Sequence, residues 1–190
     1  MVVYSVAMEI DFTTNIRTGP YAESGLGEAA RWSLDEGMEG EAFLTDYRAY
    51  LPSAEAPAAF ISAPVFDRGT RVGALVFQMP IGRINDVMTD AAGLGETGET
   101  YLVGEDKFMR SNSRFSDEST ILTQRVDTQA TRDALDGQTG AGIVEDYRGV
   151  DVVSAWTPLE ILGQHYGQIA EIDVEEAFAP AKHLFRILLG

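Results

Sequence analysis

Gly93-Leu-Gly-Glu-Thr-Gly-Glu-Thr-Tyr-Leu-Val-Gly-Glu-Asp-Lys-Phe-Met-Arg-Ser-Asn-Ser-Arg-Phe115 is the stretch that decides the fold of this chain. After a glycine-rich lead-in, it predicts a strand over Glu99–Val103, a turn over Gly104–Asp106 and a second strand over Phe108–Asn112. The strand residues are the β-branched, aromatic and long apolar types that suit a half-buried sheet. The turn carries Gly and Asp, which tolerate positive φ. We therefore expect a β-hairpin near the middle of the chain.

The lead-in also matches the pattern G-x-G-x-x-G, through Gly93, Gly95 and Gly98. In a dinucleotide site this loop follows a strand and begins a helix, so that the pyrophosphate lies on the helix N-terminus. Here the glycines follow a predicted helix and lead into a strand. The context therefore favours a flexible linker, and we predict no cofactor.

Composition excludes several classes of function. The 190 residues include 30 acidic and 14 basic side chains, giving a formal net charge of -16, whereas binding to nucleic acid needs a basic surface. There is no cysteine, so disulfides and thiol chemistry are excluded. His165 and His183 lie far apart and match no metal spacing. Ser62 and Ser154 lack a nucleophile-elbow pattern, so no catalytic or metal site is predicted and the chain is expected not to be an enzyme.

Upstream of the central stretch, the strongest local signal is a hairpin of Ala58–Phe66 and Arg71–Met79 across a turn at Asp67–Thr70. Pro80 ends this hairpin, and apolar residues at helical spacing then predict a helix from Ile81 to Ala91. The other elements expected in this half are a strand over Met1–Val6, a helix over Ser24–Glu36 and a short strand over Phe43–Tyr47.

Downstream, Asp127 is the expected cap of a short helix that ends at Leu135, before Gly137. Three strands follow, over Gly142–Tyr147, Asp151–Pro158 and Tyr166–Ile172. The last element is a helix over Glu175–Leu189, which is increasingly apolar toward its end. It is either an amphipathic helix that covers the sheet or the top of a stalk that leads to a membrane span. No stretch approaches the length of a membrane span itself.

A repeat is hidden in the spacing of prolines and glycines. Pro64 precedes Gly73 by nine positions, and Pro158 precedes Gly167 by the same nine (73 - 64 and 167 - 158). In both copies a helix follows the second strand. The pattern predicts two copies of one α+β module, each a five-stranded antiparallel sheet flanked by helices. The first copy has no counterpart of the strand Glu99–Val103, so we expect a first module that is truncated at its N-terminus.

Six segments resemble double Cache sensor domains, the extracytoplasmic parts of bacterial chemoreceptors and of some receptor kinases and cyclases. The segments are 95–104, 109–115, 145–150, 58–66, 72–81 and 83–85. The resemblance implies two PAS-like modules: a membrane-distal one over 1–80, incomplete, and a membrane-proximal one over 81–190. It also implies a periplasmic location, a homodimer, and membrane attachment through segments that this sequence does not contain. Because the first strand of the distal module is missing, we expect its sheet to be incomplete, rearranged, or completed by a partner chain along the exposed edge.

The resemblance implies ligand contacts from polar and aromatic residues near the strands of each module. Arginine would clamp a carboxylate, aspartate would take an ammonium group, and aromatic rings would form the walls. The proximal candidates are Tyr101, Arg110, Ser111, Arg114, Asp146, Tyr147, Ser154 and Trp156. The distal candidates are Arg31, Trp32, Asp46, Tyr47, Tyr50, Ser62 and Gln78. Strand tyrosines and tryptophans are also common core residues, and the arginines could form surface ion pairs.

The expected function is that of a sensor in a transmembrane signal transducer. It would bind a small molecule, namely an amino acid, a carboxylate or an amine, and shift its C-terminal helix in response. The alternative is a structural or dimerisation module that relays a signal without a ligand of its own. A third class, an acid hydrolase, would require two carboxylates in a pocket with raised or split pKa values.

Overall fold

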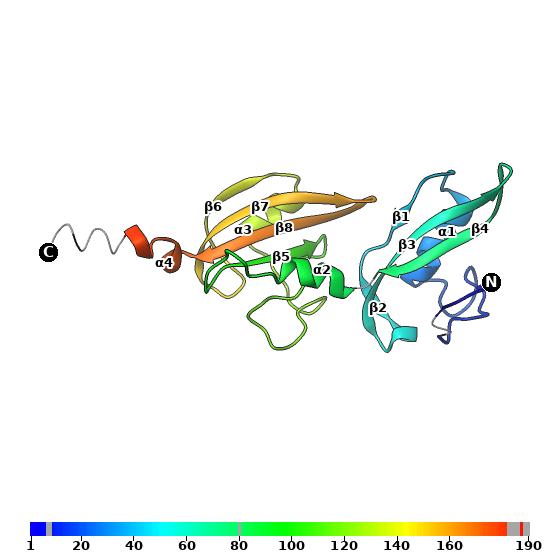
Figure 1. The fold of residues 1–190 in the computed structure, drawn as a ribbon, viewed down its shortest axis with the longest axis horizontal. Coiled ribbons are helices and arrows are strands. Elements are labelled where there is room, and N and C mark those ends of the chain that lie inside the picture. Colours follow the sequence, from blue (N-terminus) through cyan, green and yellow to red (C-terminus); the bar gives the residue numbers. More distant parts are fainter. Residues whose placement is uncertain (7–8, 80, 182–186, 188–190) are drawn as a thin grey trace. The chain divides into compact units, whose positions relative to one another are not determined.

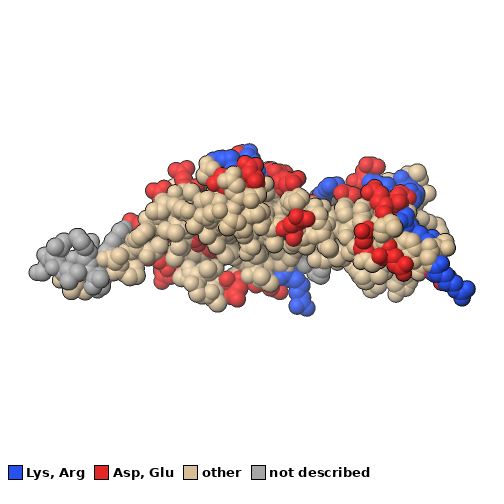
Figure 2. All heavy atoms as spheres, turned by 90° about the horizontal axis from the view of Figure 1, so that it is seen from above, with Lys and Arg blue, Asp and Glu red and all other residues tan. Residues whose placement is uncertain are grey.

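The computed structural model describes residues 1–6, 9–79, 81–181 and 187. The chain divides into two compact units (Figure 1). Unit 1 comprises Met1–Gly82 and Glu160–Gln164, and unit 2 comprises Arg83–Leu159 and His165–Gly190. Acidic side chains lie on the visible face of both units in Figure 2, as a formal net charge of -16 leads one to expect.

Unit 1 contains one antiparallel sheet with β3 at its centre. β4 pairs with one edge of β3, and β1 and β2 follow one another along the other edge. The strand predicted over Phe43–Tyr47 is shorter than expected and ends at Leu44, because Thr45 Oγ1 accepts a hydrogen bond from Phe60 N and interrupts the ladder; the next strand begins at Arg48. The elements are α1 (Gly25–Asp35), β1 (Phe43–Leu44), β2 (Arg48–Tyr50), the 3-10 helix η1 (Leu51–Ser53), β3 (Ala56–Asp67) and β4 (Thr70–Met79).

The helix α1 packs on one face of this sheet. Ser24 caps its N-terminus, and Arg71 donates to the carbonyls of Leu34 and Gly37 at its C-terminal end. Ser62 Oγ donates to the carbonyl of Ala29 at 2.8 Å, so alternate residues of β3 from Ala58 to Ser62 face α1. This face and the helix enclose the hydrophobic core of unit 1, which consists of Ile16, Leu26, Ala29, Ala30, Tyr50, Ala58 and Phe60.

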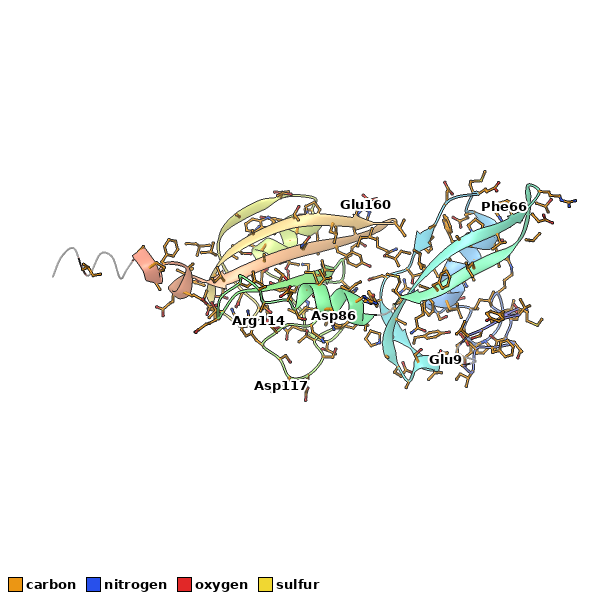
Figure 3. All side chains as sticks on the ribbon, in the orientation of Figure 1. Glu9, Phe66, Asp86, Arg114, Asp117 and Glu160 are labelled. Carbon is orange, nitrogen blue, oxygen red and sulfur yellow. The ribbon has the colours of Figure 1, made fainter. Side chains whose placement is uncertain are left out.

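The hairpin of β3 and β4 turns over Arg68 and Gly69, as predicted, and both residues have positive φ. A β-bulge between Val65 and Phe66 shifts the pairing by one residue. Phe66 lies near the tip of the hairpin in Figure 3. Because a one-residue shift moves side chains to the opposite face, the bulge decides which residues of β4 face α1. Val76 lies opposite Ser62 and packs against the core, whereas Leu75 and Phe77 point away from α1.

Unit 2 contains a second antiparallel sheet, with the strand order β5-β8-β7-β6 (Figure 1). The hairpin of β7 and β8 matches that of β3 and β4, since β8 begins and ends 94 positions after β4 (164 - 70 and 173 - 79). The elements are α2 (Ile81–Met88), β5 (Glu99–Gly104), α3 (Gln129–Leu135), β6 (Gly140–Glu145), β7 (Asp151–Ile161), β8 (Gln164–Asp173) and α4 (Val174–Ala177). The α+β class and the antiparallel sheets are confirmed.

Two predicted strands are wrong, one in each unit, so the five strands predicted in unit 2 become four. Phe108–Asn112 forms only isolated bridges, because its backbone divides its hydrogen bonds between β5 and a later loop. Arg110 N donates to Leu102 O, whereas Met109 N donates to Gln124 O. Met1–Val6 is not a strand either, and within this segment Val2 N donates to Thr14 O.

The N-terminus of α3 lies one residue later than predicted. Thr128 is the cap and accepts from Thr131 N at 3.2 Å, while Asp127 instead pairs with Lys107, Arg125 and Arg132. The helix packs closely on β8, because a Cβ atom placed on Gly167 would lie 3.1 Å from Ala134 Cβ. Ala130, Ala134, Val126, Met109, Tyr101, Val103 and Ile169 form the core of unit 2.

Replacing Thr128 with alanine is expected to lower the free energy of unfolding of unit 2 by about 1 kcal/mol, because a capping hydroxyl is lost. Each unit has one tryptophan, Trp32 in unit 1 and Trp156 in unit 2. Urea unfolding followed by Trp156 fluorescence in a Trp32→Phe background would therefore measure unit 2 alone. Thr128→Ser keeps the hydroxyl and should retain most of the stability. An equal loss in both variants would contradict the capping role.

The C-terminal helix begins at Val174, one residue before the predicted Glu175. α4 ends at Ala177 and residues 179–181 are again helical after a turn, whereas the prediction extended to Leu189; residues 182–186, 188 and 189 of the predicted range lie outside the described part of the chain. Among the described residues, no helix has the length and apolar character needed to cross a membrane.

Candidate functional site

Two glutamates lie directly opposite each other in the sheet of unit 2. Glu99 begins β5, Glu171 lies near the end of β8, and the two are register partners. Their side chains are 1% and 4% exposed, respectively. Because side chains alternate along strands, both lie on the same face as Tyr101 and Ile169, which is the face that α3 covers. We refer to Glu99 and Glu171 as the carboxyl pair.

Hydroxyl groups donate to all four oxygens of the carboxyl pair. Tyr147 Oη donates to Glu99 Oε1 at 2.6 Å and Ser113 Oγ donates to Glu99 Oε2 at 2.8 Å. Tyr101 Oη donates to Glu171 Oε2 at 2.9 Å and Ser154 Oγ donates to Glu171 Oε1 at 3.1 Å. The rings of Tyr101 and Tyr147 also meet edge to face, with their centroids 5.7 Å apart. The result is a polar cluster set into an apolar core.

The electrostatics of this cluster are unusual for a sheet interior. Neither member of the carboxyl pair forms an ion pair with a residue that the structure describes. Burial raises the pKa of Glu171 to about 7, the hydrogen bonds from Tyr101 and Ser154 lower it, and the charges of Asp146 and Glu99 raise it further. Like charges opposite each other in a sheet are destabilising. The site therefore favours either a proton or an added positive charge.

Five of the predicted proximal candidates lie at or beside the carboxyl pair. Tyr101, Tyr147 and Ser154 donate to it, and Trp156 packs against the same hydrophobic core. Asp146 is buried and accepts from Arg148, whose guanidinium also donates to Asp173 at 2.7 Å.

The other three proximal candidates support the backbone around β5. Arg110 is buried, donates to Phe108 O and pairs with Asp106 at 2.9 Å, where it fills the space beside Gly104. Ser111 Oγ accepts from Leu102 N at 3.0 Å. Arg114, labelled in Figure 3, donates to Gly98 O at 2.6 Å.

Glu99, Glu171 and Ser113 were not among the residues predicted for the site. A glutamate in a strand ordinarily faces solvent, and no local pattern distinguishes these two. One usable signal was that Glu99 precedes the nearly continuous apolar run Tyr101–Val103, which is typical of a strand buried on both faces.

The glycine-rich lead-in has a structural role beside this site. Glu176 of α4 accepts from the backbone N–H groups of Glu96 at 2.9 Å and Thr97 at 2.7 Å, and from the Thr97 hydroxyl. These hydrogen bonds hold the pKa of Glu176 below its usual value. Gly95 has a φ of +69°, and a Cβ atom there would collide with the Glu176 carboxylate. The loop before β5 is thus attached to α4 at Glu96 and Thr97, three and two positions before Glu99.

The distal candidates do not form a single cluster in unit 1. Arg31 donates to Ala22 O, and Trp32 stacks on Phe43 with the ring centroids 5.2 Å apart. Ser62 Oγ donates a hydrogen bond to Ala29 O in α1, and the exposed side chain of Gln78 donates to Ser53 Oγ. Two further tyrosines lie near acidic side chains.

Tyr50 Oη donates to Asp11 Oδ2 at 2.6 Å in the core of unit 1. Tyr47 is buried beside Asp46, whose Oδ1 accepts from Tyr47 N. Burial raises the pKa of Tyr47 to about 12. Its hydroxyl lacks a hydrogen-bond partner among the described residues. Unit 1 therefore offers scattered polar groups, and unit 2 offers the organised cluster. No group of three metal-ligating side chains is found among the described residues.

No protein-family model and no curated protein matches the chain. Solved structures do match. The periplasmic sensory domain of the Campylobacter jejuni chemoreceptor Tlp1 superposes with a TM-score of 0.61 at 15% identity, over 80% of this chain and 57% of that one. The ligand-binding domain of the Pseudomonas aeruginosa amino-acid chemoreceptor PctC, in complex with GABA, gives 0.55 at 16% identity, over 82% and 63%.

A third match is the extracellular domain of mmHK1S-Z3, which is described as a histidine kinase. Its TM-score is 0.56 at 18% identity, over 76% of this chain and 53% of that one. The chain thus spans between 53% and 63% of the length of these three structures. The resemblance noted in the sequence is confirmed for the fold, which is that of periplasmic ligand-binding, Cache-like sensory domains of chemoreceptors and histidine kinases.

Proposed function

We propose that this chain, which shares its fold with the sensory domains of chemoreceptors and histidine kinases, is the ligand-sensing part of an extracytoplasmic receptor. The supporting similarity is to periplasmic and extracellular domains, one of them in complex with GABA. In this proposal the chain is not an enzyme, and the two units are PAS-like modules, with unit 2 nearer the membrane. Segments outside this sequence would attach it to the membrane and carry the signal onward.

The ligand in this proposal is a small molecule with a protonated amine, and it binds at the carboxyl pair. The observation that carries the proposal is the pair itself: two buried glutamates, directly opposite in the sheet, without a cation among the described residues. An ammonium group offers several N–H donors and a positive charge, which a pair of carboxylates would accept. Tyr101, Tyr147 and Trp156 would supply aromatic walls.

Occupancy would reach α4 through the loop before β5. Glu99 lies two positions after Thr97, and Thr97 both donates to Glu176 and accepts from Asp173 N at 3.1 Å. Glu171 lies two positions before Asp173, at the other side of the same junction. A ligand that moved either glutamate would therefore bias the position of α4, and the signal would be the difference in ligand affinity between two such positions.

The raised pKa of Glu171 would also be compatible with an acid hydrolase, which is an alternative function for this site. One observation favours sensing, namely that the matched structures are sensory domains. A relay module without a ligand is the other rival, and a ligand screen separates it from the proposal.

A thermal-shift screen at pH 8 tests the proposal, using amines, amino acids, carboxylates and neutral sugars in parallel. At least one amine should raise the melting temperature, because a ligand at 100 times its dissociation constant stabilises the folded state by about 2.7 kcal/mol. The effect should be lost in Glu171→Gln and retained in Glu145→Gln, a control on the exposed side of β6. If no compound stabilises the protein, the relay alternative is favoured instead.

A further inference from the structure

We propose that the free edge of β4 in unit 1 pairs with the β4 edge of a second copy of this chain, antiparallel and across a two-fold axis. β3 occupies one edge of β4 over its whole length, and no other strand formed by the described residues pairs with the second edge. An unpaired strand edge exposes a row of N–H and C=O groups that can template pairing with another chain.

The chain itself shows that this position in the sheet accepts a strand. After a shift of 94 positions, β8 has the same bounds as β4, and β7 ends where β3 ends and begins one residue later. In unit 2, β5 pairs with the second edge of β8 over six residues, from Glu99 to Gly104. The corresponding edge in unit 1 is the one that β4 leaves free.

β4 also lacks the features that protect natural edge strands. Lysine, proline and charged side chains usually prevent edge pairing, yet β4 carries no charge and no proline from Val72 to Met79. The two edges of the unit 2 sheet are shorter, at six residues each in β5 and β6, and both include a glutamate. In a chain with a net charge of -16, an uncharged strand is where two copies can approach without repulsion.

The face of β4 that points away from α1 is apolar and exposed. Leu75 is 50% exposed and Phe77 is 59% exposed, and both share this face with Ile61 and Val65 of β3. A two-fold axis perpendicular to the sheet keeps this face on the same side in both copies. Edge pairing would therefore join two apolar surfaces into one and bury part of both.

The side chains favour one register. With the axis at Leu75, each Leu75 lies opposite its own copy, and each Phe77 lies opposite Gly73 of the other chain. A Cβ atom on Gly73 would meet nothing within 4 Å, so there is room for an aromatic ring beside it. A cross-strand aromatic over a strand glycine is a favourable arrangement. Arg71 then falls at the end of the paired segment, opposite Met79.

Single cysteines test this register without interference, because the natural chain has none. In an antiparallel pair, opposite residues have Cα atoms about 4.5–5.5 Å apart, which suits a disulfide, whereas residues two positions from the axis lie about 13–14 Å from their own copies. Under mild oxidation, Leu75→Cys should form covalent dimers faster than Gly73→Cys or Phe77→Cys alone, on the order of tenfold. A mixture of Gly73→Cys and Phe77→Cys should cross-link to each other.

The control is Ile143→Cys, which places a thiol on β6 at a residue that is 58% exposed. It should cross-link no faster than background. Sedimentation velocity between roughly 1 and 100 µM should show a dimer that Phe77→Lys dissociates, with circular dichroism confirming that this surface variant is folded. Equal cross-linking at all four positions would overturn the proposal. So would a monomer throughout this concentration range, or a dimer that Phe77→Lys leaves intact.

Discussion

Glu171→Gln is expected to stabilise unit 2 above pH 7 and to remove most of its pH dependence between about pH 4.5 and 7. Burial raises the pKa of Glu171 from 4.5 to about 7 in the folded protein. Between these values the folded state binds more protons than the unfolded state, so the stability of the natural protein falls as the pH rises. The shift corresponds to a loss on the order of 3 kcal/mol by pH 8, which the neutral amide of glutamine avoids.

The measurement is urea unfolding at several pH values from 4.5 to 8.5, followed by Trp156 fluorescence in the Trp32→Phe background. Glu145→Gln is the matched control, because it removes a carboxylate from an exposed position on β6 and should leave the slope unchanged. If the natural protein and Glu171→Gln lose stability equally between pH 5 and 8, the pKa of Glu171 is not raised in the folded protein, and this outcome would contradict the prediction.

Tyr101→Ala is expected to cause the largest loss of stability of any single substitution named here, about 3–5 kcal/mol. The Tyr101 side chain is completely buried, packs against Tyr147 and lies in the core of unit 2 beneath α3. Its removal would leave a cavity and would also take a donor from Glu171. Since small domains are stable by only about 5–15 kcal/mol, this loss would be a large fraction of the free energy of unfolding of unit 2.

Tyr101→Phe separates packing from hydrogen bonding. The ring remains, so most of the stability should be retained. The hydrogen bond from Tyr101 lowers the pKa of Glu171, so its loss should move the pH range of the stability change upward. Unfolding of both variants in urea at pH 5 and pH 8 provides the readout. A phenylalanine variant as unstable as the alanine variant would show that the hydroxyl, and not the ring, supports the core.

Turns and helix ends were predicted correctly where they depend on residues that are neighbours in the sequence. The turn over Asp67–Thr70 was found because Gly69 takes positive φ, and α3 ends as predicted before Gly137. Phe108–Asn112 was assigned wrongly because strand propensity describes side chains that fit a sheet. It does not say which backbone partner will be present. Here the Ser111 hydroxyl takes the Leu102 N–H, and the loop around Gln124 takes the Met109 N–H.

Hydroxyl groups of the site were predicted from the sequence, but the two glutamates were not, because their pairing depends on the register between two strands. Tyr101 and Ser154 were candidates because polar groups on strands near a covered face are common in binding sites, and both do reach the carboxyl pair. The pair itself depends on the register between β5 and β8, which are separated by about sixty residues of sequence and paired by tertiary structure. No spacing rule connects Glu99 with Glu171. The assignment of distal and proximal roles to the two units stays a prediction.

The β-bulge at Val65 and Phe66 shows the same limit in unit 1. A repeat of prolines and glycines aligns Leu75 with Ile169 and Phe77 with Glu171, at a shift of 94 positions. Ile169 and Glu171 are buried, whereas Leu75 and Phe77 are exposed. The one-residue shift in pairing places Leu75 and Phe77 on the face away from α1, and a sequence repeat does not reveal it.

Isothermal titration calorimetry of the strongest amine from the screen, at pH 6 and pH 8, tests directly whether the carboxyl pair recognises a positive charge. The natural protein should bind about tenfold more tightly at pH 8 than at pH 6. With a pKa of about 7, Glu171 is mostly ionised at pH 8, whereas at pH 6 it must first lose a proton before it can bind the ammonium group as a carboxylate. Glu171→Gln should bind weakly at both pH values. Equal affinity at both pH values in the natural protein, or undiminished binding by Glu171→Gln, would contradict the assignment of this site.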